Sequence, residues 1–379
     1  MRESPMSVTM VEVRSRRDLH SFVHFPFRLY RSCPYWVPPL LRDEYATLRR
    51  DKNPAFENCT ARYWLAYRDG AAVGRIAGII NHAYIAKWND PRARFGWVDF
   101  IDDREVSGAL YRSVEDWARS EGMASIHGPL GFTDMDREGM LVEGFSELST
   151  MATNYNYSYY PVHTEALGYV KDTDWLEFEI KVPESLPEKV LRIADLTMER
   201  RGLHALDAKR SKDLLPYARQ IFGVINQTYE NLYGFVPLTE KQVDMYVKQY
   251  FPNVVPDYLK LILDKDDKVA AFVIAMPSLS RALQKSKGRL LPFGFLYVLW
   301  ALRHPRTLDL YLGAVRPDQQ GKGADALLIT ELNKSCIKNR IVSAESNLEL
   351  EDNVLVQAHW KHFERRQHKR RRCYVKRIS

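Results

Sequence analysis

Residues 308–328 read LDLYLGAV RPDQQGKGA DALL, and the interpretation of the whole chain starts from them. The first part alternates apolar residues with others, which is typical of a strand, and Pro317, Gly321 and Gly323 then indicate a turn. The apolar spacing over residues 326–332 predicts an amphipathic helix after the turn. Glycines before a helix let an anion approach the first helical amides, which have no partner within the helix. The stretch therefore predicts either a phosphate-binding corner or an ordinary strand–turn–helix connection.

The same turn resembles the acetyl-CoA-binding motif of the GNAT acyltransferase superfamily, which is written Gln/Arg-x-x-Gly-x-Gly/Ala. Gln320 and Gly323 match this motif, whereas Asp325 stands where its last Gly or Ala usually lies. A carboxylate there repels a pyrophosphate unless it turns away. The resemblance implies that acetyl-CoA or another acyl-CoA binds as co-substrate, with its pantetheine arm along the backbone edge of a splayed strand. The residues expected to bind it are Leu312, Gly313, Ala314, Val315, Gln320, Gly321, Lys322, Gly323, Ala324, Asp325 and Asn353.

The composition fits a chain of more than one domain that works in the cytoplasm. It has 379 residues, and its hydrophobic content of 45% is sufficient for proper cores. The net charge of +7 suits an anionic ligand but is too diffuse to indicate nucleic acid by itself. The cysteines are far apart and form no CxxC pair, so we expect free thiols, no disulfides and no metal site. The N-terminus has no long apolar core, so we expect no signal peptide and a cytoplasmic location.

The two halves of the sequence show a similar order of predicted elements. Over residues 8–182 the order is strand, helix, hairpin, strand, helix, strand, helix and strand, and a similar order begins after a proline-bounded linker at 183–187. With the GNAT resemblance, this implies an α/β (α+β) protein with tandem GNAT-like folds, each a mixed, mainly antiparallel twisted sheet flanked by helices. We expect a degenerate N-terminal domain at 1–182, a linker or start of the second half at 183–200, and a C-terminal GNAT domain with the CoA-binding motif at 201–379. Residues 101–105 of the first half are acidic and lack a glycine turn, so that half is not expected to bind pyrophosphate in the usual way.

Transfer of an acyl group to an amine requires a base, because an amine with a pKa of about 10.4 is mostly protonated near neutrality. Glu345, at the end of a strand predicted over 341–345, is the first candidate for this base, and Asp309 is the second. In the superfamily an Asn opens the next helix, and a Tyr seven residues later can protonate the leaving thiolate. Asn353 fits the first position, but the second is Trp360, whose indole N–H is not a practical acid. Three alternatives for the thiolate stay open: another acid such as His359 or His362 protonates it, it leaves without an acid, or the protein has lost catalysis. Trp360 itself could simply pack in the core.

Three longer strings resemble the bacterial YghO-like proteins, which are GNAT relatives. They are PYWVPP at 34–39, GRIAGIINH at 74–82 and GPLGFTDMDREGML at 128–141. The third string is interpreted as a pocket wall between the halves, with Asp134 and Asp136 as substrate-binding residues. It also begins like a calcium loop, but Phe145 replaces the Glu that the twelfth position of an EF-hand needs.

These observations combine into an acyl-CoA-dependent N-acyltransferase that acts on a small-molecule or peptide amine, with the first half shaping the acceptor site. A non-catalytic acyl-CoA-binding or regulatory protein is the alternative, indicated by Asp325, Trp360 and the loss of the Gly-Phe that usually ends the last helix. Nucleic-acid binding through the basic residues 365–377 is less favoured, because the repeat makes them a solvated hairpin.

The apolar run at 290–302 is too short to span a bilayer. We interpret it as a buried or lid segment, with contact to a membrane surface as the alternative. The sequence leaves a monomer and a homodimer open.

Overall fold

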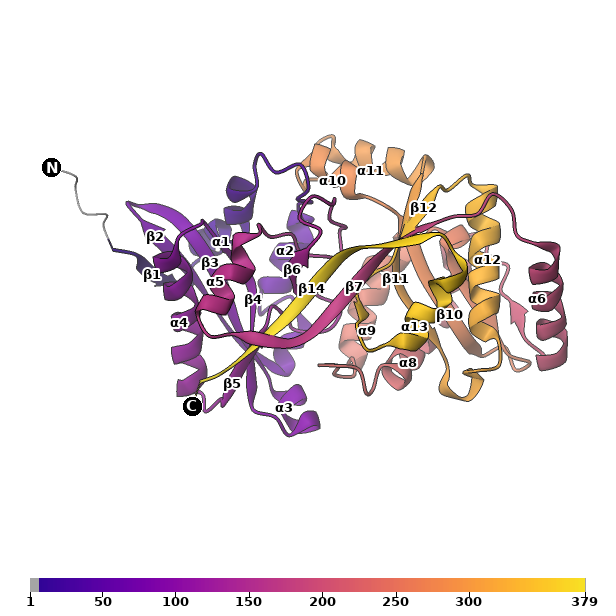
Figure 1. Ribbon diagram of the computed structural model, residues 1–379, viewed down its shortest axis with the longest axis horizontal. Coiled ribbons are helices and arrows are strands. Elements are labelled where there is room, and N and C mark those ends of the chain that lie inside the picture. Colours follow the sequence, from indigo (N-terminus) through magenta and orange to yellow (C-terminus); the bar gives the residue numbers. More distant parts are fainter. Residues whose placement is uncertain (1–6, 379) are drawn as a thin grey trace. The chain divides into compact units, whose positions relative to one another are not determined.

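The computed structural model describes residues 7–378 and confirms the expected mixed α/β fold (Figure 1). Its contacts divide the chain into two compact units. The first unit comprises Met1–Leu176, Ser280–Tyr297 and Lys369–Ser379, and the second comprises Glu177–Leu279 and Val298–His368. Each unit therefore contains segments from both halves of the sequence. The domain boundaries expected at residues 182 and 200 divide the sequence into consecutive segments, and they remain a prediction.

Strands and flanking helices alternate in the first part of the chain. The strands are β1 (Thr9–Glu12), β2 (Cys59–Arg68), β3 (Ala71–Asn81), β4 (Arg92–Phe100), β5 (Ser125–Gly128), β6 (Met140–Glu143) and β7 (Val170–Lys181). The helices are α1 (Arg16–Leu29), α2 (Leu41–Leu48), α3 (His82–Trp88), α4 (Arg104–Ser120) and α5 (Tyr159–Ala166), with a 3₁₀ turn η1 (Pro54–Glu57).

The second part of the chain has the same kind of alternation. The strands are β8 (His204–Ala205), β9 (Leu259–Leu263), β10 (Val269–Pro277), β11 (Thr307–Val315), β12 (Ser343–Glu345), β13 (Glu349–Leu350) and β14 (Arg365–Arg377). The helices are α6 (Glu188–Arg201), α7 (Ser211–Leu214), α8 (Ala218–Thr228), α9 (Glu240–Tyr250), α10 (Ser280–Ser286), α11 (Gly294–Arg303), α12 (Ala324–Lys338) and α13 (Val354–Ala358). The 3₁₀ turns are η2 (Leu215–Tyr217), η3 (Phe251–Asn253), η4 (Pro256–Tyr258), η5 (Pro317–Gln319) and η6 (His359–His362).

Both units are built on the same pattern of strand pairing. The strand order is β1-β2-β3-β4-β5-β14 in the first unit and β8-β9-β10-β11-β12-β7 in the second. One parallel pair lies among antiparallel strands in each, β4 with β5 and β11 with β12. Parallel neighbours need a crossover connection, which α4 supplies in the first unit and α12 in the second. Helices α4 and α12 are therefore equivalent parts of two repeats.

In each unit, the last strand of the order given above comes from the opposite half of the sequence. In the second unit, Ser343–Glu345 of β12 pairs antiparallel with residues 179–181 of β7. In the first unit, Ser125–Gly128 of β5 pairs antiparallel with residues 374–377 of β14. Strands β7 and β14 each begin in one unit and end in the other. Separation of the halves at residue 182 would therefore remove one strand from the paired strands of each unit.

Helix α4 packs on the strands of the first unit through one apolar face. Leu110, Val114 and Trp117 are at most 4% exposed. Strand β3 has glycines where the helix lies on it: a Cβ at Gly74 would lie 2.6 Å from Leu110, and one at Gly78 would lie 2.6 Å from Trp117. Close packing thus explains two glycines of the string at 74–82.

Some predicted elements differ from the structure for local reasons. The helical segment at 211–228 is divided into α7, η2 and α8, because Pro216 cannot continue an α-helix. The helix expected to begin at Asn353 is limited to α13 and η6. Residues 188–200, which were expected to be linker or the start of the second half, lie in helix α6 (Glu188–Arg201). No helix within residues 7–378 is both long and apolar enough to cross a membrane.

The basic residues 365–377 form the single strand β14, so the solvated hairpin expected from the sequence is wrong. Lys369 and Arg371 are at most 1% exposed, because β14 pairs with β5 and β6. Arg370 and Arg372 bind the fully buried carboxylate of Asp174, with N–O distances of 3.1 and 2.8 Å. Burial raises the pKa of Asp174, but hydrogen bonds from the two arginines outweigh it and lower the pKa below its ordinary value.

Asp174→Ala is expected to destabilise the protein by about 3 kcal/mol, because Arg370 and Arg372, both largely buried, lose their shared buried partner and keep only the exposed Glu143 and Glu165. Urea unfolding near neutral pH measures the loss. Glu364→Ala is the control, because it breaks an exposed ion pair with Lys181 and is expected to cost less than about 1 kcal/mol. Equal losses in the two variants would contradict this role of Asp174.

Candidate functional site

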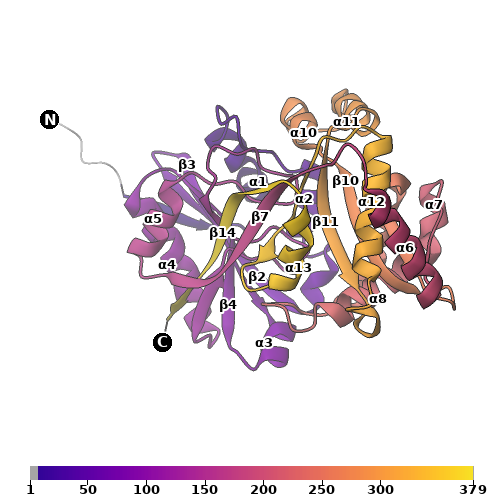
Figure 2. The same ribbon diagram turned by 45° about the vertical axis from the view of Figure 1, so that its right-hand side comes forward.

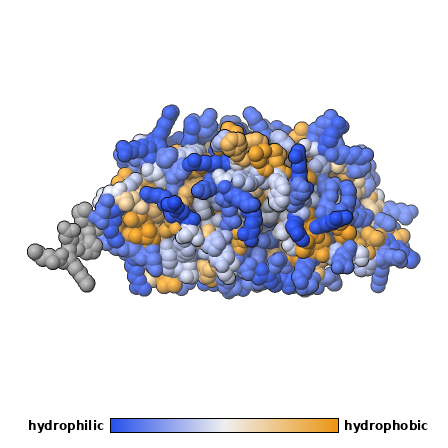
Figure 3. All heavy atoms as spheres, turned by 90° about the horizontal axis from the view of Figure 1, so that it is seen from above, coloured by the Kyte–Doolittle hydropathy of each residue, from blue (hydrophilic) through white to orange (hydrophobic). Residues whose placement is uncertain are grey.

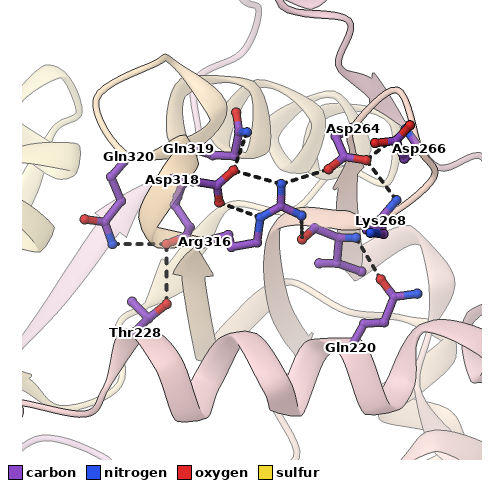
Figure 4. A network of polar contacts seen from close by, with 11 residues as sticks. Gln220, Thr228, Asp264, Asp266, Lys268, Arg316, Asp318, Gln319 and Gln320 are labelled. Atoms are coloured by element: carbon purple, nitrogen blue, oxygen red, sulfur yellow. Dashed lines mark hydrogen bonds and ion pairs between the residues drawn. The ribbon is translucent and has the colours of Figure 1, made fainter.

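The turn between β11 and α12 is held in place by Arg316 (Figure 4). Its guanidinium donates to Asp318, with an Nε–Oδ1 distance of 2.5 Å, and to Asp264 of the β9–β10 hairpin, with an Nη2–Oδ2 distance of 2.8 Å. A third bond, to the carbonyl of Val269, is 3.2 Å long. The hydrogen bond from Arg316 lowers the pKa of Asp318 to about 2, so this network stays charged across the physiological range. The turn is thus anchored to the sheet without help from a ligand.

Gly323 is the N-cap residue of α12 and has a left-handed backbone, with φ of +89°. A Cβ there would lie 3.0 Å from Cγ2 of Thr197 in α6, which packs beside α12 (Figure 2). Within the described residues, no side-chain hydrogen bond caps this end of the helix. The first amides of α12 therefore present the positive end of the helix dipole, and the exposed Lys322 adds a full charge. These are the features of an anion-binding corner.

The equivalent helix of the first unit is closed to anions. Asp103 caps α4 and accepts hydrogen bonds from the amides of Glu105 and Val106, at 2.9 and 3.1 Å. Arg68 pairs with Asp103 at 2.6 Å. A carboxylate thus occupies the place that a phosphate would take. This supports the expectation that the first half does not bind pyrophosphate in the usual way.

Asp325, which departs from the GNAT motif, bonds to a histidine. Its Oδ2 lies 3.1 Å from Nε2 of His359 in η6. The hydrogen bond from His359 lowers the pKa of Asp325 from its ordinary value, so the group is a carboxylate at neutral pH. The negative charge beside the α12 N-terminus therefore bonds to His359 on η6, and the backbone amide of Ala326 also interacts with it.

Strand β11 separates from β12 soon after its start. The parallel pairing joins Thr307, Leu308 and Asp309 to β12 and then ends. A bulge follows at Tyr311, because Ala275 of β10 is opposite Leu310 while Ile274 is opposite Leu312. Residues 312–315, the expected pantetheine edge, therefore lie beyond the part of β11 that pairs with β12, while they stay paired with β10 on their other side.

Side chains already occupy two carbonyl groups of this edge. The hydroxyl of Tyr229 donates to Gly313 at 3.0 Å. Thr228 and Gln320 donate to Val315 at 3.4 and 3.1 Å (Figure 4). Burial raises the pKa of Tyr229 to about 12, so its hydroxyl stays a donor. A ligand that uses these carbonyl groups requires Thr228, Tyr229 and Gln320 to move.

The two acidic residues selected from the sequence lie on adjacent strands. Asp309 of β11 and Glu345 of β12 are opposite each other in the parallel register, and Glu179 of β7 is opposite Glu345 on its other side. Asp309 is 3% exposed, whereas Glu345 is half-buried, with Nε2 of His368 at 3.8 Å from its Oε2. Glu345 is therefore the more accessible of the two candidate bases.

Another carboxylate, which the sequence analysis missed, has the environment that a base needs. Glu349 is 8% exposed, and burial raises its pKa to about 7. The indole Nε1 of Trp360 donates to its Oε1 at 2.7 Å. Trp360, in the position of the usual Tyr, is thus the hydrogen-bond partner of a buried acid. A carboxyl group with a pKa near neutrality can take up and release a proton under physiological conditions.

No protein-family model matches the sequence. Protein YghO of Escherichia coli (strain K12) is 29% identical over 373 residues, which cover 96% of this chain and 94% of that protein. Bacterial ceramide synthase of Caulobacter vibrioides (strain NA1000 / CB15N) is 27% identical over 301 residues, 78% of this chain and 77% of that protein. The resemblance to YghO-like proteins is thereby confirmed.

A solved structure extends over the whole chain. The tandem GNAT protein from the clavulanic acid biosynthesis pathway superposes with a TM-score of 0.56 and 13% identity, over 98% of this chain and 99% of that chain. This chain has the tandem GNAT fold. A GCN5-related glucosamine N-acetyltransferase region of a fungal multi-domain GH3 β-N-acetylglucosaminidase gives a TM-score of 0.55 and 12% identity, over 99% of this chain and 38% of that chain.

The second unit of this tandem GNAT fold contains the predicted cofactor-binding residues and both candidate bases. Asn353 begins α13 and accepts a hydrogen bond from the amide of Val356 at 3.4 Å, so its observed role is that of a helix cap. Its role toward acyl-CoA remains a prediction.

Asp134 and Asp136 lie in the first unit, in the loop between β5 and β6. Asp136 accepts hydrogen bonds from the amides of Phe132 and Thr133, at 2.8 and 3.1 Å, which closes a turn. Burial raises the pKa of Asp136 to about 6. Asp136 therefore has a structural role in shaping the loop, and substrate binding by Asp134 and Asp136 stays a prediction.

One cluster of potential metal ligands lies in the first unit. Ligand atoms of His127, Asp172 and Cys373 lie within 4.8 Å of one another. However, Arg92 binds Asp172 at 2.8 Å, and burial together with Arg94 and Arg92 lowers the pKa of His127 well below its ordinary value. Two arginines beside the cluster oppose a bound cation, so we assign no metal to it.

Proposed function

We propose that this protein is an acyl-CoA-dependent N-acyltransferase whose donor binds to the second unit, at the N-terminus of α12. The contrast between the equivalent helices carries this proposal: Asp103 caps α4, whereas α12 begins at an uncapped glycine turn. The splayed end of β11 offers an edge for the pantetheine arm. Acetyl-CoA and longer acyl-CoAs are the candidate donors. The free cysteines of the chain fit the reducing conditions of the cytoplasm, where we propose that the protein acts on such a donor.

The proposed reaction is direct attack of an amine nitrogen on the thioester carbonyl carbon. Glu349 takes the proton that the ammonium group must lose before attack, and Glu345 and Asp309 are the alternative bases. The C–N bond forms and the C–S bond breaks. The remaining proton on the attacking nitrogen passes to the CoA thiolate, directly or through water, which gives an amide and a free thiol.

The relative in Caulobacter vibrioides suggests the acceptor to test first. Its name states that it makes ceramide, which is an N-acylated long-chain amino alcohol. We therefore propose long-chain amino alcohols as the first class of small-molecule amine, followed by other small amines and peptides.

A non-catalytic acyl-CoA-binding protein is the second candidate. It is favoured by Trp360 in the position of the usual acid, because an indole cannot protonate the thiolate. Binding of acyl-CoA without turnover of any acceptor would select it.

Calorimetry with CoA, acetyl-CoA and long-chain acyl-CoAs tests the donor site, and release of free thiol with a panel of amines tests the reaction. Micromolar binding and amine-dependent thiol release are the expected results. An absence of binding to every CoA compound would overturn the proposal.

Asp325→Asn is expected to tighten acyl-CoA binding by about threefold. It removes a negative charge beside the helix N-terminus, and one charge in such a place changes the free energy by about 0.3–1 kcal/mol. Calorimetry at low salt measures the change. Asp266→Asn removes an equal charge from the exposed β9–β10 turn and is the matched control, expected to bind as the wild type does. Weaker binding by Asp325→Asn would instead mean that the Asp325–His359 bond organises the site.

A further inference from the structure

The apolar run that was expected to be buried or to form a lid is exposed. In the segment that leads into α11, Leu291 is 78% and Phe293 is 70% exposed. In α11 itself, Leu296, Tyr297 and Trp300 are 51%, 45% and 63% exposed. Figure 3 looks onto the side on which Figure 1 draws α10 and α11, and it shows hydrophobic side chains gathered on the surface. Side chains of this size at such exposure indicate an interaction surface.

The exposed residues form a continuous face. Phe293, Leu296, Tyr297 and Trp300 follow the spacing i, i+3, i+4, i+7, which is one side of a helix. Residues 290–302 contain no charged side chain. Tyr and Trp combine a large apolar ring with a polar group, a combination that is enriched where lipid meets water.

Basic side chains border this face, and acidic ones are missing. Residues 268–308 contain no Asp or Glu. The exposed cations Arg281, Lys285, Lys287 and Arg289 precede the face, and Arg303 and Arg306 follow it. Nζ of Lys285 lies 5.9 Å from the ring centroid of Tyr297. Such a border matches the negative surface of a bilayer that contains anionic lipid.

We propose that the exposed side chains of residues 281–306, which cover α11 and all of α10 except its first residue, are a membrane-docking surface that binds the anionic face of a lipid bilayer. The apolar side chains of α11 and of residues 291–293 enter the region between headgroups and acyl chains, and the bordering arginines and lysines bind lipid phosphates. Helix α11 is too short to cross the bilayer, so the protein lies on the membrane. The charge border distinguishes this partner from a second copy of the chain, because the same cations would face each other across a symmetric dimer.

Flotation of the purified full chain with vesicles tests this inference and needs no enzymatic activity. Phosphatidylcholine vesicles with about 30 mol% phosphatidylglycerol are expected to bind the protein, and pure phosphatidylcholine vesicles are expected to bind it about tenfold or more weakly. Added salt should weaken the binding, because part of it is electrostatic.

Two double variants separate the apolar contribution from the electrostatic one. Leu291→Ser with Phe293→Ser is expected to lower vesicle partitioning about tenfold or more. Arg281→Glu with Arg303→Glu is expected to lower it to a similar degree, about fivefold for each lost basic residue. The matched control is Val162→Ser with Val170→Ser, two exposed apolar residues outside this surface, and it should float as the wild type does. All of these side chains are exposed, so thermal unfolding should show the variants to be folded.

Failure of the wild type to float with anionic vesicles would overturn the inference. So would unchanged flotation of the Leu291/Phe293 variant. A wild-type dimer that this variant converts to a monomer, without flotation of either, would identify a second copy as the occupant and would equally overturn it.

Discussion

Gly323→Glu is expected to abolish measurable acyl-CoA binding, with a dissociation constant raised about a hundredfold or more, which is about 2.7 kcal/mol. The substituted carboxylate would lie over the first amides of α12, where Asp103 lies over those of α4 in the first unit. It would neutralise the charge that attracts the pyrophosphate and occupy its space. The left-handed backbone at φ +89° adds strain for any side chain. Calorimetry with acetyl-CoA and a long-chain acyl-CoA measures the loss.

Matched variants separate charge from strain. Gly323→Gln has nearly the same size and strain as Gly323→Glu but no charge, so it is expected to retain part of the affinity. Gly70→Glu places the same charge at another positive-φ glycine, in the β2–β3 hairpin, and should leave binding unchanged. If Gly323→Glu binds acyl-CoA with the affinity of the wild type, the turn is an ordinary strand–turn–helix connection. The donor would then not bind at the N-terminus of α12.

The repeat could be predicted because its signals are local. The alternation of β11, the glycine turn and the apolar face of α4 are set by residues close in sequence, and the structure contains each of them. The exchange of the last strands could not be predicted in the same way. The residues of β7 and β5 that select their partners lie far along the chain from β12 and β14, and strand alternation alone does not say which edge a strand joins.

Charge was the least reliable sequence signal. The basic residues of β14 suggested a solvated face, yet Lys369 and Arg371 are buried and Asp174 binds two of their neighbours. A single acidic residue, separated from β14 by most of the second half, changes the meaning of the whole basic run. The apolar run at 290–302 was expected to be buried, yet many of its side chains are exposed. Apolar composition predicts burial on average, but it does not show which apolar residues stay on the surface.

In the candidate site, too, some features could be predicted from local sequence and others depend on the fold. The cradle at Gln320–Asp325 follows from a contiguous motif, whereas Glu349 has no sequence signal that separates it from Glu351 two residues later. Only the burial of Glu349 and its bond to Trp360 distinguish it. The unusual Trp therefore became informative once its partner was known.

Glu349→Gln is expected to lower kcat about a hundredfold to ten-thousandfold, with little change in acyl-CoA affinity, because it removes the proposed base and leaves the phosphate cradle intact. In the wild type the base must be ionised, so activity should rise with pH through about 7, the pKa to which burial raises this group. That limb of the pH profile should be absent in the variant. Trp360→Phe removes a hydrogen bond that lowers the pKa of Glu349, so it should move the limb to higher pH.

The same variant separates catalysis from stability. The raised pKa of Glu349 means that the folded protein keeps a proton that the unfolded chain loses above the ordinary value of 4.5, so folding becomes less favourable as pH rises from there to about 7. Glu349→Gln removes this cost, and it should match the wild type near pH 4 and exceed its stability by up to about 3 kcal/mol near pH 8. An inactive variant that is more stable at high pH would thus locate the base and exclude misfolding. If instead Glu345→Gln or Asp309→Asn removes the limb near pH 7 while Glu349→Gln keeps it, the base lies on β11 or β12, and the Glu349–Trp360 pair is a structural contact.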